Sequence, residues 1–145
     1  GFAAGPTGGR QSLLPPWLFL PEARTAVDVT SDAPVAVNNL SSAVVLSLEI
    51  PAGLVVSLRQ IGFGALDMSA IPWATWSLKI GTAYLDGYHF LPAAIGTIDQ
   101  PADVNIVAQG NQTLEVWVTN NHPTRVFRYF ARLAGWKYDP AKVGE

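Results

Sequence analysis

Apolar and polar residues alternate along several stretches of this chain, and a period of two is typical of β-strands with one buried face. The clearest stretch is 75–80, where Trp76, Leu78 and Ile80 share one face. Further strands are predicted at residues 26–30, 34–37, 46–50, 54–63, 104–108, 114–118 and 127–133. The predicted core contains Leu46, Leu48, Ile50, Leu78, Ile80, Val116 and Phe127.

Turn residues separate these strands, and no stretch shows the repeat of an amphipathic helix. Pro51-Ala52-Gly53 and Gly110-Asn111 predict turns. The alternation slips by one residue near Arg59-Gln60, which predicts a β-bulge or a strand that crosses between sheets. Short strands separated by turns in this way indicate an all-β antiparallel sandwich or barrel. The long predicted connections are 65–72 and 81–101.

The first 24 residues are predicted to form an extended arm. Pro15 and Pro16 exclude a helix interior and a central strand there. The arm is too apolar for an ordinary disordered linker, because it contains Leu13, Leu14, Trp17, Leu18, Phe19 and Leu20. Two interpretations stay open: the arm folds over its own domain, or it docks on a neighbouring subunit. The chain thus divides into an arm (1–24), a sandwich domain (25–138) and a short tail (139–145).

The chain carries unusually little charge for its apolar content. Charged residues make up 14% and hydrophobic residues 49% of its 145 residues, whereas soluble domains carry roughly 25% charged residues. No apolar run approaches the ~18–20 residues that span a bilayer, so protein partners are the predicted cover for this surface. Nine basic residues and a net charge of −2 argue against nucleic-acid binding.

Motifs for catalysis or metal binding are not found in the sequence. There is no cysteine, and the two histidines, His89 and His122, lack metal-ligand spacing. No nucleophile elbow and no phosphate-binding loop before a helix occur. His122 belongs to the Asn120–Pro123 segment, which predicts a tight hairpin connection. We therefore predict no enzymatic activity, no cofactor and no metal site.

Two aromatic residues fall on strand faces that should be solvated. Trp117 lies between Val116 and Val118, opposite the apolar stripe, and Phe130 shares its face with Arg128 and Arg132. Three interpretations stay open for such an outward Trp: packing under a loop, an interface, or a platform for stacking sugars. Trp and Arg together are enriched at interface hot spots.

The end of the last predicted strand resembles a known group of proteins. An aromatic strand from Val126 runs into Gly135-Trp136-Lys137-Tyr138, and the Ile50–Gly53 turn leads into a long strand. Over roughly residues 43–138 these features resemble jelly-roll virion proteins of tailed bacteriophages. The resemblance implies an antiparallel jelly-roll-like β-sandwich. It also implies a role in decorating or cementing capsids as trimers, or in head fibres and tail parts.

We therefore expect a structural virion protein, a capsid cement or decoration subunit assembled in the host cytoplasm. Its expected partners are its own copies, as a homotrimer, and the major capsid protein or another virion protein, with no nucleic acid and no membrane. The alternative is a receptor- or glycan-binding module of a tail or head fibre, for which Trp73 and Tyr88 are available in loops. The predicted partner contacts are Leu13, Leu14, Trp17, Leu18, Phe19, Leu20, Trp117, Arg128, Phe130 and Arg132.

Overall fold

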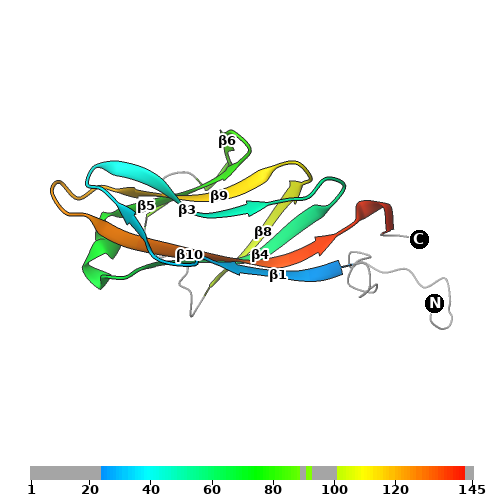
Figure 1. The fold of residues 1–145 in the computed structure, drawn as a ribbon, viewed down its shortest axis with the longest axis horizontal. Helices are drawn as coiled ribbons and strands as arrows, with labels where there is room; N and C mark the ends of the chain where they lie inside the picture. The colour runs from blue at the N-terminus through cyan, green and yellow to red at the C-terminus, as the bar shows by residue number, and fades with distance from the viewer. Residues whose placement is uncertain (1–23, 89–90, 93–100, 143–145) are drawn as a thin grey trace.

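A computed structural model describes residues 24–88, 91–92 and 101–142 as two β-sheets packed face to face (Figure 1). The first sheet, sheet A, contains β1 (Arg24–Thr30), β2 (Val35–Val37), β4 (Val55–Ala65), β8 (Ala102–Gln109) and β10 (Phe127–Tyr138). The second, sheet B, contains β3 (Ser41–Glu49), β5 (Ala74–Ile80), β6 (Ala83–Tyr84), β7 (Leu91–Pro92) and β9 (Thr113–Asn120). The predicted all-β sandwich is therefore confirmed. The predicted arm contacts at Leu13, Leu14 and 17–20 lie outside the described residues.

The strand pairs are nested in the sequence and all are antiparallel. β1 and β2 pair with β10, β3 pairs with β9, β4 pairs with β8, and β5 pairs with β6 and β7. The chain is thus one long antiparallel ribbon, and the β10–β4 and β9–β5 pairs roll it into two sheets. This is the arrangement of a jelly roll, which the resemblance implied.

Because the strand pairs are nested, the loops between strands lie at the two ends of the sandwich. The β2–β3, β4–β5 and β9–β10 connections lie at one end, on the left in Figure 1. The β3–β4 and β8–β9 turns lie at the other end, together with the start of β1 and the end of β10. Two short 3-10 helices complete the described residues, η3 (Met68–Trp73) and η4 (Pro140–Lys142). Within this part of the chain no helix has the length and apolarity to cross a membrane.

Aromatic packing fills the space between the sheets. The ring of Trp76 stacks on Phe63, with centroids 4.4 Å apart, and meets Tyr129 edge-on at 5.7 Å. All seven predicted core residues contribute: Leu48 and Ile80 are half-buried against the core, and the other five are buried. The predicted face of each major strand is therefore correct.

The predicted slip near Arg59-Gln60 is a β-bulge. On β10, Ala134 lies opposite Gln60 and Gly135 lies opposite Leu58, so Arg59 has no partner there. The same residue is skipped in the pairing of β4 with β8. A Cβ atom on Gly135 would lie 2.1 Å from the carbonyl oxygen of Ser57. Close packing of two backbones at the bulge therefore requires glycine at this position.

Several element bounds differ from the sequence prediction. β3 begins at Ser41, five residues before the predicted start at residue 46. Its pairing with β9 skips Val45. β10 continues to Tyr138, five residues beyond the predicted end at residue 133. The predicted long connection 81–101 contains β6 and β7, whose two-residue length leaves no alternation to detect.

Replacement of Leu78 by alanine should destabilise the domain by about 2–5 kcal/mol, because the side chain is 1% exposed between the sheets. Val107→Ala is the matched control, since Val107 is an apolar residue that is 52% exposed. Urea unfolding followed by tryptophan fluorescence measures both changes. Equal losses in the two variants, or no loss in Leu78→Ala, would contradict the strand phase described here.

Candidate functional site

Three loops at one end of the sandwich carry most of the exposed apolar side chains. We call this surface the loop end; it comprises residues 38–40, 66–73 and 121–126. Seven large hydrophobic side chains are exposed in the described part of the chain, and five of them belong to the loop end. The five are Leu40, Leu66, Met68, Trp73 and Val126. Apolar side chains gathered on one surface in this way are typical of interaction sites.

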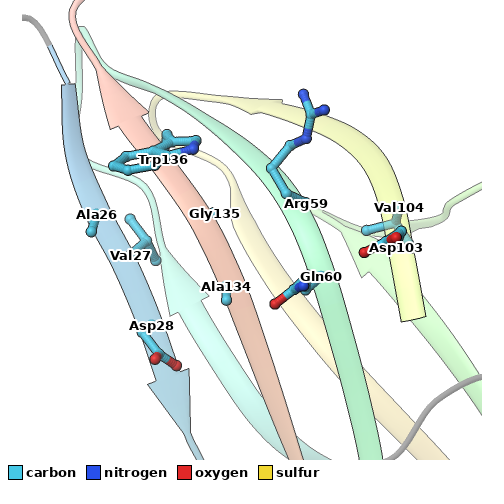
Figure 2. Close-up of a pocket in the computed structure, with 10 residues that line it drawn as sticks. All are labelled: Ala26, Val27, Asp28, Arg59, Gln60, Asp103, Val104, Ala134, Gly135 and Trp136. Atoms are coloured by element: carbon cyan, nitrogen blue, oxygen red, sulfur yellow. The ribbon is translucent and has the colours of Figure 1, made fainter. Parts of the chain in front are cut away.

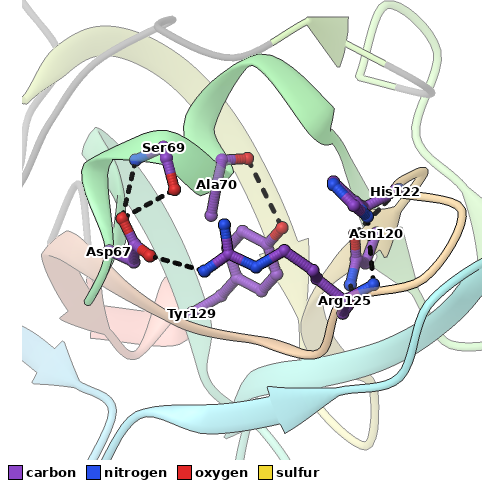
Figure 3. Close-up of polar contacts among 7 residues, drawn as sticks. All are labelled: Asp67, Ser69, Ala70, Asn120, His122, Arg125 and Tyr129. Carbon is purple, nitrogen blue, oxygen red and sulfur yellow. Dashed lines mark hydrogen bonds and ion pairs between the residues drawn. The ribbon is translucent and has the colours of Figure 1, made fainter.

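The conformation of η3 is fixed by a capping aspartate. The Asp67 Oδ1 atom accepts hydrogen bonds from the backbone N–H of Ser69 at 2.9 Å and from its hydroxyl at 2.8 Å (Figure 3). The Arg125 guanidinium binds the other carboxylate oxygen at 3.2 Å. These hydrogen bonds, that of the Ser69 hydroxyl foremost, lower the pKa of Asp67. The ion pair also joins η3 to the β9–β10 connection.

The β9–β10 connection is held by the side chains of a histidine and an asparagine. His122 Nδ1 accepts hydrogen bonds from the backbone N–H groups of Thr124 at 3.1 Å and Arg125 at 3.0 Å. The buried Asn120 amide donates to the carbonyl oxygens of Val37 and Arg125, and its oxygen accepts from the His122 N–H (Figure 3). Both side chains therefore satisfy backbone groups of the connection. The predicted hairpin is wrong, because β9 belongs to sheet B and β10 to sheet A, and the connection crosses between the sheets.

Further contacts tie the β9–β10 connection to the loops on either side. The Asn39 amide donates to the Pro123 carbonyl at 2.9 Å. Asn121 donates twice to the Trp73 carbonyl, from its backbone N–H at 2.9 Å and from its side chain at 3.1 Å. The Trp73 indole meets the His122 ring edge-on, with centroids 4.6 Å apart. The three loops are therefore fixed relative to one another before any partner binds.

The polar groups of the loop end hold the loops and do not form a catalytic relay. The Ser69 hydroxyl donates to Asp67, whereas a nucleophilic serine would donate to a histidine. His122 Nδ1 is occupied by backbone donors and so does not bind a carboxylate. In the described ranges no three His, Asp or Glu side chains are grouped to hold a metal ion. The absence of enzymatic activity, cofactor and metal remains a prediction.

The structure brings together three of the predicted contact residues, on the outer face of sheet A. Arg128 is exposed, and Phe130 lies half-buried over Gly64. Arg132 forms a bidentate ion pair with Asp28, at 2.8 and 2.7 Å. The hydrogen bonds from Arg132 lower the pKa of the Asp28 carboxyl. This face thus presents two guanidinium groups beside the half-buried ring of Phe130.

The fourth described residue of that set, Trp117, lies on the opposite side of the sandwich. It belongs to β9, on the outer face of sheet B, and is half-buried. Its indole N–H donates to Glu115 at 3.1 Å, and the Lys79 ammonium lies 4.9 Å from the ring centroid. No single surface can therefore contain Trp117 together with Arg128, Phe130 and Arg132.

The sequence prediction named Trp73 but missed the rest of the loop end. Leu66 and Met68 are isolated apolar residues within the predicted 65–72 connection, and this was the available signal. Leu40 and Val126 gave no comparable signal, because their proximity to η3 depends on the strand order.

Together these observations define a class: an all-β jelly-roll domain with an apolar, internally braced loop end. Comparison of the sequence with models of known protein families gives no match, and comparison with curated proteins gives none either. The function is therefore inferred from the surfaces of the domain.

Tyr129, beneath η3, predicts a specific loss of stability in alkali. Its hydroxyl donates to the Ala70 carbonyl at 3.5 Å, and burial raises its pKa to about 12. The pKa of Tyr129 in the folded state exceeds the ordinary value of about 10. The protonated hydroxyl therefore contributes its full stabilisation below about pH 10, and this stabilisation is lost as the pH rises through about 12. We expect Tyr129→Phe to abolish this loss.

Urea unfolding of both proteins near pH 8 and near pH 11.5 provides the measurement. Between these two pH values the free energy of unfolding should fall by about 2 kcal/mol less in Tyr129→Phe than in the wild-type protein. Other tyrosines and lysines titrate alike in both proteins and therefore cancel. An identical pH dependence for the two proteins would show that Tyr129 ionises without restraint.

Proposed function

We propose that this protein is a structural, non-enzymatic subunit of a virion, a capsid cement or decoration protein that acts through protein–protein contacts. The carrying observation is the loop end, where five exposed large hydrophobic side chains lie on loops fixed by hydrogen bonds. The virion assignment itself rests on the resemblance of residues 43–138 to jelly-roll virion proteins of tailed bacteriophages.

The energetics favour a partner over the loop end. Burial of one large apolar side chain stabilises a contact by roughly 1.5–3 kcal/mol. Met68 is 79% exposed and Leu40 is 66% exposed, so most of this stabilisation is still available to a partner. Because the loops are already ordered, binding loses less conformational entropy than it would with loops that order on contact.

The apolar arm supports association between copies. Leu20 is four residues before Arg24, and Trp17 is seven residues before it. Even a fully extended chain therefore reaches only about 14 Å from Arg24 at Leu20 and about 25 Å at Trp17. Arg24 pairs with Tyr138, at the opposite end of the 12-residue strand β10 from the loop end. That strand is about 36 Å long. Trp17 to Leu20 are thus too far away to cover the loop end of their own domain.

We infer that these arm residues dock on the loop end of a neighbouring copy and form a homo-oligomer. A trimer is the state that the bacteriophage resemblance implies. The low charge of the chain, 14%, is consistent with a surface that is partly covered in the assembled state. The major capsid protein, or another virion protein, is the proposed further partner.

The loop end is tested by removing its apolar side chains in the full chain. Multi-angle light scattering over a concentration series should show wild-type protein at about 46 kDa, three times the chain mass of 15.5 kDa. The double variant Leu66→Ser/Met68→Ser should need a protein concentration about tenfold higher or more than the wild type to stay associated. A loss of roughly 1.4 kcal/mol in association free energy corresponds to this factor of ten. Val107→Ser is the control, with similar exposure on β8. A wild-type protein that stays at 15.5 kDa, or equal association of all three proteins, would contradict the proposal.

The arm is tested separately by Trp17→Ser/Phe19→Ser in the full chain. We expect this variant to lose association while its melting temperature, measured on dilute monomer, stays unchanged. The reason is that the arm is proposed to bury its side chains on another copy. A large drop in the melting temperature of the monomer would show instead that the arm packs on its own domain.

A further inference from the structure

The outer face of sheet A contains a depression of about 570 Å³ between β1, β10, β4 and β8 (Figure 2). Its lining includes the polar residues Asp28, Arg59, Gln60 and Asp103 and the aromatic residue Trp136. The volume falls within the range of small-molecule sites, about 300–1,000 Å³. The depression lies on the side of the domain away from sheet B, and its lining contains no residue of the loop end.

The β-bulge at Arg59 produces this depression. The bulge leaves Arg59 unpaired with either neighbouring strand and brings it to the outer surface beside Gln60 (Figure 2). On β10, Ala134 and Gly135 supply little or no side chain, so the space in front of them stays open. Bulges often redirect side chains next to binding sites. Gly135 is required for close packing of the backbones, so the bulge and the depression are built together.

Trp136 forms a fixed wall of the depression. It lies opposite Ala26 on β1, with Arg24 and Asp28 on either side of Ala26 along that strand. The Arg24 guanidinium lies 4.1 Å from the centroid of the Trp136 rings. Arg24 therefore braces the indole from the side of the strand start, while the side towards Asp28 borders the depression. An indole held in this way loses little freedom when a ligand stacks on it.

The polar side chains around the depression can still form hydrogen bonds. Arg59, Gln60 and Asp103 have no side-chain hydrogen bond or ion pair within the described ranges. Asp28 is held by Arg132, yet its carboxylate retains free acceptor positions. The set offers both donors and acceptors. Two carboxylates, Asp28 and Asp103, stand beside three guanidinium groups, those of Arg24, Arg59 and Arg132, so the set mixes charges of both signs. It therefore favours a neutral ligand that is rich in hydroxyl groups.

We propose that this depression binds a neutral saccharide. The apolar face of one sugar ring stacks on Trp136, and the hydroxyl groups of this ring and of the sugars linked to it bind Gln60, Arg59 and Asp103. A purely apolar ligand would leave these polar groups unpaired, which is costly. An anionic polymer would meet the carboxylates of Asp28 and Asp103. The depression is open to solvent on the sheet surface, so it suits a terminal or internal sugar of a longer glycan.

A panel of immobilised neutral oligosaccharides, built from hexoses and N-acetylhexosamines, tests this with the full-length protein. The best binder is then measured by titration calorimetry. Trp136→Ala should weaken binding by about tenfold or more, which corresponds to roughly 1.4 kcal/mol. Tyr84→Ala is the matched control and should bind as wild type, because Tyr84 is an exposed aromatic residue on β6 in sheet B, away from the depression. Gln60→Ala removes a hydrogen-bonding group without touching the indole and should weaken binding severalfold.

The proposal is overturned if no oligosaccharide binds at millimolar concentration. It is also overturned if Trp136→Ala and Tyr84→Ala bind alike, or if neither Trp136→Ala nor Gln60→Ala weakens binding. Circular dichroism of each variant separates loss of binding from loss of fold. If Trp136→Ala does not fold, the Gln60→Ala result decides in its place. None of these outcomes depends on oligomer formation through the loop end.

Discussion

The pairing of β10 with strands on both of its sides is the constraint on which the rest of the structure depends. This strand lies between β1 and β2 on one side and β4 on the other, and it joins the first and last parts of the ribbon. Its inward residues, Phe127, Tyr129, Ala131 and Leu133, are all buried. At its start Phe127 packs edge-on against His122 of the loop end, with centroids 5.5 Å apart. Near its other end, Gly135 and Trp136 shape the depression. One strand therefore positions both candidate surfaces.

The bulge reconciles the hydrophobic pattern of β4 with a single buried face. Val56 and Leu58 point inward before Arg59, and Ile61 and Phe63 point inward after it. Leu58 and Ile61 are three residues apart, whereas side chains on one face of a regular strand recur every two residues. An additional residue is needed to keep both pairs in the core. The depression on the outer face thus follows from the core packing of the same strand.

The sequence predicted most of the fold because half-buried strands carry their own signal. Strand 75–80 differs from β5 by one residue, and the slip at Arg59-Gln60 marks the bulge. The start of β3 was missed because Val44, Val45 and Leu46 are consecutive apolar residues that hide the alternation around an irregular pair.

Candidate surfaces were less predictable than strands. The shared face of Arg128, Phe130 and Arg132 follows from the period of two along one strand. The loop end combines residues near positions 40, 70 and 125, and only the nested pairing of distant strands brings them to one end. The depression likewise needs four strands in register, and no local pattern along the sequence reports that.

The central claim, that the loop end is covered by protein in the assembled state, is tested most directly through Met68. This is the single methionine of the chain, and it is 79% exposed in the isolated domain. Its oxidation by dilute peroxide, followed by mass spectrometry, therefore reports one site on the loop end. We predict that Met68 oxidises several times more slowly in concentrated oligomer or on capsids than in dilute protein. An oxidation rate that is the same in all three states would contradict the account.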